Sequence, residues 1–202
     1  MTSSDKKLIR RWYWSGAVLV FLMVIIGGIT RLTGSGLSMT EWEPIMGAIP
    51  PMSDAEWIDA FEQYKQYPEY QQVNRGMSLG DFKYIFFWEY FHRLIGRVLG
   101  LVFLIPFAWF LIKKKFDAQQ TRRSVFLLAL GVGQGLMGWF MVQSGLIDIP
   151  AVSHYRLAAH LLLAFTIFGS CIWFAMDLYE QKREALHSLR EMKTWLGLFL
   201  FF

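Results

Sequence analysis

A carboxylate, an imidazole and a guanidinium lie close together at Glu89, His92 and Arg93. The surrounding residues 84–112 are otherwise largely apolar and numerous enough to cross a bilayer as a helix. Residues three or four positions apart share one face of a helix, so Glu89 and His92 are expected side by side, with Arg93 next to them. Ionisable groups at that depth usually face a bundle interior, a cavity or a cofactor. The pattern therefore predicts a functional cluster.

A second cluster follows in the apolar residues 155–178, where Arg156 precedes His160 by one helical turn. Both apolar segments are expected to cross the membrane in the same direction, which places His92 and His160 at nearly the same depth. Two imidazoles on parallel helices of a bundle form the ligand set of a six-coordinate haem. A hydrogen bond to a backbone carbonyl is the alternative for either histidine alone. Zinc is disfavoured, because no third and fourth ligand converge in the sequence.

Haem propionates are anions that need cations near the aqueous edge of a site. Arg93 and Arg156 are suitably placed for that role, and Arg31 is a further candidate at the end of the first apolar segment. Glu89 distinguishes the hypothesis of an enzyme from that of an electron carrier, because a bis-histidine cytochrome needs no carboxylate one helical turn from a haem ligand. A proton acceptor beside a haem edge suits oxidation of a bound substrate. The alternative is a Glu–Arg ion pair that only steadies the bundle.

The helices that must position these residues are visible in the composition. The chain is 54% hydrophobic and 17% aromatic, with a mean hydropathy of +0.33, and its hydrophobicity is concentrated in blocks. Four blocks reach the roughly 20 residues that cross a hydrocarbon core: residues 12–32, 84–112, 124–146 and 155–178. The sequence predicts an all-α, polytopic membrane protein built on a four-transmembrane-helix bundle. Its single cysteine, Cys171, excludes an intrachain disulfide.

The distribution of charge predicts the orientation in the membrane. The net charge is +4, but its distribution argues against a nucleic-acid partner and for a lipid bilayer. Basic residues gather before the first block, between the second and third, and after the fourth, whereas the long loop between the first two is mainly acidic. The positive-inside rule then makes the N-terminus cytoplasmic. No Arg- and Ser-rich transit segment precedes the first block, which favours a bacterial cell inner membrane over the mitochondrial inner membrane.

The same features divide the chain into segments. We expect a cytoplasmic tail at 1–11, a haem-binding transmembrane domain at 12–178 with an outer loop at 33–83, a cytoplasmic linker at 179–193, and the truncated start of a fifth span at 194–202. Within the outer loop, the residues from Ser53 to Glu56 resemble a capping box. They predict a short amphipathic helix over 54–66, with another over 68–74. These helices are expected to form an interfacial cap without chemistry.

Three stretches resemble a known family: GGITRLTGSGLS at 27–38, EYFHR at 89–93 and AHL at 159–161. They are similar to haem A synthase, the CtaA family, and closest to its alphaproteobacterial and mitochondrial branch. The resemblance implies an eight-helix membrane protein of two similar four-helix halves, each with a histidine pair. It also implies oxidation of the C8 methyl group of haem O to a formyl group, giving haem A for cytochrome oxidase.

By this resemblance, His92 and His160 are the haem ligands of the N-terminal half, where haem O is the substrate, and Glu89 is the catalytic carboxylate. A resident haem b would belong to the other half, whose residues lie beyond Phe202. The implied partners are haem O, haem O synthase and cytochrome oxidase assembly factors, and a homo-oligomer is left open. Unlike some bacterial members, this chain has no cysteine pair in its first outer loop.

Two rival functions stay open from the residues alone. One is a bis-histidine b-type cytochrome subunit that transfers electrons and leaves its haem unaltered. The other is a haem-delivery or assembly factor without turnover. Glu89 favours the enzyme, and this 202-residue chain is expected to bind haem weakly or to be inactive by itself.

Overall fold

The computed structural model describes residues 1–40, 49–146 and 150–179. Within them the regular secondary structure is entirely helical, in the order α1 (Ser3–Leu32), α2 (Asp54–Tyr64), α3 (Pro68–Gln72), α4 (Leu79–Ile112), α5 (Ala118–Gly145) and α6 (His154–Asp177). The four long helices have the length and apolar composition to cross a membrane, so the chain is an all-α, multi-pass membrane protein, as predicted. Outside the described residues lie 41–48 of the outer loop, the predicted linker beyond Tyr179, and the apolar run 194–202.

Three of the long helices begin earlier than the hydrophobic blocks predict, including α5, which starts at Ala118 after the capping residue Asp117 and ahead of the predicted residue 124. A capping box between Thr2 and Asp5 starts α1 at Ser3, so the helix runs through most of the predicted tail 1–11. A second capping box starts α4 at Leu79, ahead of the predicted residue 84. Capping residues satisfy the free N–H groups of a first turn, so polar sequence can continue a helix beyond the apolar span.

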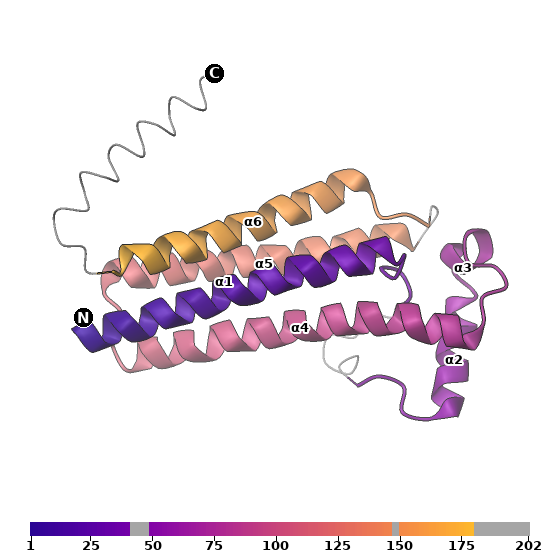
Figure 1. Ribbon diagram of the computed structural model, residues 1–202, viewed down its shortest axis with the longest axis horizontal. Coiled ribbons are helices and arrows are strands. Elements are labelled where there is room, and N and C mark those ends of the chain that lie inside the picture. Colours follow the sequence, from indigo (N-terminus) through magenta and orange to yellow (C-terminus); the bar gives the residue numbers. More distant parts are fainter. Residues whose placement is uncertain (41–48, 147–149, 180–202) are drawn as a thin grey trace, which may run out of the picture.

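The four long helices lie side by side, with α2 and α3 at one end (Figure 1). We call that end the loop end and the opposite one, which holds the N-terminus, the N-terminal end. Helix α1 packs against both α4 and α6, and α5 packs mainly against α6. Helices α4 and α6 run in the same direction, opposite to α1 and α5 (Figure 1). The two histidine-bearing helices are therefore parallel, with α1 packed against both.

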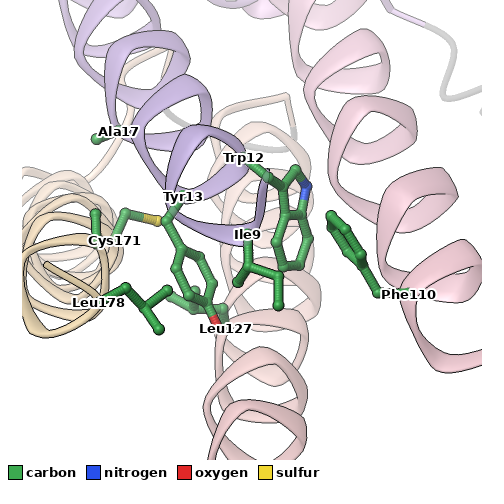
Figure 2. Packing of buried hydrophobic residues seen from close by; sticks show 9 residues of the cluster. Ile9, Trp12, Tyr13, Ala17, Phe110, Leu127, Cys171 and Leu178 are labelled. Atoms are coloured by element: carbon green, nitrogen blue, oxygen red, sulfur yellow. The ribbon is translucent and has the colours of Figure 1, made fainter. Parts of the chain in front are cut away.

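A first buried core ties the helices together at the N-terminal end (Figure 2). Trp12 of α1 stacks on Phe103 with ring centroids 4.4 Å apart and lies 5.4 Å from Phe110, both on α4. Its neighbour Tyr13 points the other way, and its hydroxyl lies 2.9 Å from that of Ser124 on α5. Because lipid tails are as apolar as these side chains, packing and hydrogen bonds of this kind hold such helices together.

A second buried core lies at the loop end. Phe82 of α4 stacks on Phe61 and Tyr64 of α2, with ring centroids 5.0 and 5.1 Å apart. Met39 and Phe86 belong to the same cluster. The predicted helices 54–66 and 68–74 are present but shorter, as α2 and α3. Their apolar side chains thus pack on α4, so this part of the loop is a folded cap on the bundle.

Candidate functional site

Glu89 lies at the centre of a polar network near the loop end. Its side chain is buried, with 2% of the residue's surface exposed. One carboxylate oxygen, Oε2, accepts hydrogen bonds from the Ser38 hydroxyl and from the Met39 backbone N–H, each at 2.8 Å. The other, Oε1, accepts from the guanidinium of Arg93, one turn along α4. Arg93 also donates to the Met39 carbonyl at 3.2 Å.

Three of these four contacts place a donor on the Glu89 carboxylate. A carboxylate that accepts from a hydroxyl, a backbone amide and a guanidinium is satisfied as an anion. The same bonds fasten the chain segment that follows α1 to the side of α4. The predicted Glu–Arg ion pair is therefore present, and it also anchors the start of the outer loop. Sequence spacing predicted that Arg93 lies beside Glu89, but it did not predict the contacts of Glu89 with Ser38 and Met39.

His92 lies on α4 one turn beyond Glu89, against the glycine-rich end of α1. A Cβ built on Gly27 would lie 3.4 Å from Nε2 of His92. That distance is at the lower limit of an ordinary van der Waals contact, so the glycine lets the end of α1 pack closely against the imidazole. The ring is partly buried. The small residues at the end of α1 thus lie next to a candidate ligand.

His160 lies in a similar setting on α6, against α5. A Cβ on Gly138 would lie 3.3 Å from Cε1 of the His160 ring. Nε2 of the ring is 3.2 Å from the side-chain amide nitrogen of Gln134. The other ring nitrogen, Nδ1, is buried and has no hydrogen-bond partner among the described residues, and the same is true of the Gln134 amide oxygen. Gln134 stands out in the sequence as a polar residue within a glycine-rich span.

The two imidazoles are suited to a haem. His92 and His160 lie on parallel helices that both pack against α1. A glycine on a neighbouring helix packs closely against each ring, and His160 has a buried nitrogen with its hydrogen-bonding capacity unused. Among the described residues, no three His, Cys, Asp or Glu side chains form a group that could hold a metal ion alone. A pair of neutral imidazoles fits the axial positions of a haem iron.

Known proteins are similar to this chain over most of its length. A family model described as "Cytochrome oxidase assembly protein" (COX15-CtaA) matches residues 10–202. The chain belongs to this family. It is 51% identical to the "Heme A synthase" of Flavobacterium psychrophilum over 93% of this chain and 56% of that protein. It is 52% identical to the one of Flavobacterium johnsoniae over 89% and 53%, and 50% identical to that of Parvibaculum lavamentivorans over 92% and 54%.

The chain spans about half the length of the curated relatives it matches, with 56% of the F. psychrophilum protein covered. No solved structure matches the chain. Within the COX15-CtaA family, the relatives named above are all called Heme A synthase. The shared region contains both histidines, Glu89 and the four long helices, so the residues described here belong to the part of the chain that matches the family.

The three arginines predicted as propionate partners differ in their surroundings in this COX15-CtaA member. Arg93 is engaged by Glu89 and Met39. The guanidinium of Arg156 lies 4.1 Å from the centre of the Phe140 ring, a cation–π contact between α6 and α5. Arg31 is exposed at the end of α1. Neither Arg156 nor Arg31 has a carboxylate partner within the described part of the chain.

A second buried carboxyl group lies in the outer loop and was not predicted. Glu69 of α3 is only 7% exposed, and the Tyr64 hydroxyl donates to it at 3.2 Å. Asn74 donates to that hydroxyl at 2.7 Å. Burial, and then the charge of Glu89, raise the pKa of Glu69 to about 7, although the bond from Tyr64 opposes the shift. The loop helices therefore hold a titratable group within electrostatic reach of Glu89.

Proposed function

We propose that this chain is the haem O-binding part of a haem A synthase, an enzyme that oxidises the C8 methyl group of haem O to the formyl group of haem A. The observation that carries the proposal is the pair of part-buried histidines on parallel helices, His92 on α4 and His160 on α6, with α1 packed against both helices. Membership of the COX15-CtaA family, with relatives named Heme A synthase, supports it.

In this proposal His92 and His160 supply the axial ligands that fix the plane and height of the substrate haem. Gly27 and Gly138 let the neighbouring helices pack closely against the two rings. Arg156 and Arg31 are the cations available to haem propionates, and Arg93 contributes positive charge from within the Glu89 network. The same assignment implies a resident haem b in the remaining part of the full-length enzyme. It also implies haem O synthase as the supplier of haem O and cytochrome oxidase assembly factors as recipients of haem A.

We assign the catalytic carboxylate to Glu89. It shares a face of α4 with His92, one turn nearer the loop end, so it lies towards one edge of a ring held by the histidines. Oxidation of a methyl group releases protons, and a carboxylate beside the reacting carbon can accept one. The Ser38 hydroxyl can donate to the carboxylate or, after rotating, accept from the carboxylic acid, whereas Arg93 can only donate and so favours the anion.

The test is conversion of haem O by the full-length enzyme, purified from cells that lack their own haem A synthase. Extracted haems are separated by chromatography. Haem A is expected from the wild type, whereas His92→Ala and His160→Ala should each lose haem A production and alter the visible spectrum of the bound haem. Normal haem A production by either alanine variant would exclude that histidine from the substrate site.

A further inference from the structure

Gln134 binds the atom of His160 that an iron would need. The amide nitrogen of Gln134 lies 3.2 Å from Nε2 of the imidazole, and each side chain is part-buried between α5 and α6. A neutral imidazole has one N–H and one nitrogen with a free lone pair. With the amide N–H as donor, Nε2 carries the lone pair, which is the nitrogen through which histidine commonly binds metals.

The other polar atoms of the pair show that this contact is not part of a larger network. Nδ1 of His160 and the amide oxygen of Gln134 are both buried without a hydrogen-bond partner in the described residues. A buried polar atom without a partner costs free energy, so a structural amide is normally satisfied at both ends. Here only the bond to Nε2 holds the amide, so no second bond keeps it in place against a stronger ligand for Nε2.

We propose that Gln134 is a displaceable partner of His160 that makes haem ligation at this site reversible. The amide and the iron compete for the lone pair of Nε2, so binding of either one to His160 weakens binding of the other. This inference rests on the proposed function, because a haem that is a substrate must leave once it has been oxidised, whereas a resident cofactor need not. Among the described residues no amide or hydroxyl is hydrogen-bonded to His92, so the competition acts on one axial ligand.

The test removes the competing amide and follows haem release. Gln134→Leu has a similar volume and cannot hydrogen-bond. Hemin is added to the full-length protein in detergent, and its transfer to excess apomyoglobin is recorded by visible absorbance. The release phase that belongs to this site is the one that His160→Ala removes. We expect that phase to slow by about two- to tenfold in Gln134→Leu, which is the range of one net hydrogen bond, with an undiminished low-spin, six-coordinate spectrum.

Two further variants make the result decisive. Gln134→Met, which is more flexible, should slow release in the same direction. Gln119→Leu makes the same chemical change at an exposed position of α5 and should leave the rate unchanged. Unchanged or faster release from Gln134→Leu, or loss of its six-coordinate spectrum, would overturn the competition and make Gln134 a support for the ligand. If His160→Ala removes no release phase, the haem site itself is wrong, and the proposed function fails with it.

Discussion

At the scale of single residues, Glu89 has two roles, a proposed one in proton transfer and one in anchoring the outer loop, and a single substitution of Glu89 affects both. Its carboxylate is our proposed proton acceptor, and it also accepts hydrogen bonds from Ser38 and Met39. Replacing it with glutamine puts an amide N–H group against donors, so Glu89→Gln disturbs the loop contact as well as removing the charge. Ser38→Ala removes one of the loop contacts and leaves the carboxylate in place.

We therefore expect Glu89→Gln to lower haem A production by about 100-fold, within the usual range for a lost acid–base group. Ser38→Ala should retain most of the activity. Both are measured by haem extraction and chromatography from the full-length enzyme. Equal losses in the two variants would show that Glu89 acts by anchoring the loop, and normal haem A production by Glu89→Gln would make the carboxylate structural.

Glu69 predicts a dependence of loop stability on pH. Its pKa is raised to about 7, above the usual value of a glutamate, so the folded loop binds its proton more tightly than the unfolded loop does. Stability of the cap should therefore fall as the pH rises from about 4.5 through 7, by about 3 kcal/mol at most. Glu69→Gln should remove this dependence. Hydrogen-exchange protection of α2 and α3 at pH 6 and pH 8, corrected for intrinsic exchange rates, measures it.

Sequence spacing predicted the site residues only where the contact is local. Glu89 and Arg93 are neighbours because they are one turn apart on a helix. The partners of Glu89 in the outer loop are 50 and 51 residues away, and no period in the sequence connects them. The burial of Glu69 was not predicted for the same reason. From sequence, a carboxylate in an acidic loop is expected to be solvated, and only the folded structure shows its burial against Tyr64.

At the scale of helices, glycines determine how closely the imidazoles approach their neighbours. Gly138→Ala would place a methyl group 3.3 Å from His160, so the ring or the helix must shift. Gly135→Ala on the same helix meets nothing within 4 Å and is the matched control. We expect Gly138→Ala to shift the bound haem towards a high-spin spectrum and to hasten its release, while Gly135→Ala leaves both unchanged. Identical spectra for the two variants would contradict a role for close packing at Gly138.

Helix existence was easier to predict than helix extent. Long apolar blocks determine that α1, α4, α5 and α6 form, because only a helix satisfies the backbone within a bilayer. Where α1 and α4 begin depends on Thr2 and Ser78, whose side chains cap helices in polar sequence. The loop helices were predicted from a capping box and from polar and apolar spacing, which cannot show whether their apolar faces lie on lipid or, as here, on α4.

At the scale of the whole molecule, the positive-inside rule gives a testable orientation. We expect the N-terminal end to face the cytoplasm and the loop end to face outwards. Ser4→Cys and Gln71→Cys place thiols at exposed positions of the two ends, whereas Cys171 is buried. In intact cells a membrane-impermeant maleimide should label only the Gln71→Cys protein. Labelling of the Ser4→Cys protein alone would reverse the topology.

The two buried cores lie at opposite ends of the bundle, one around Trp12 and the other around Phe82, while His92 and His160 occupy the stretch between them. Both histidines are only partly buried. On α4, Phe82 and Phe86 belong to one core and Phe103 and Phe110 pack in the other, so the helix is held on both sides of His92. The height of the imidazole in the bundle is therefore set by aromatic packing at both ends of its helix, remote from the histidine itself.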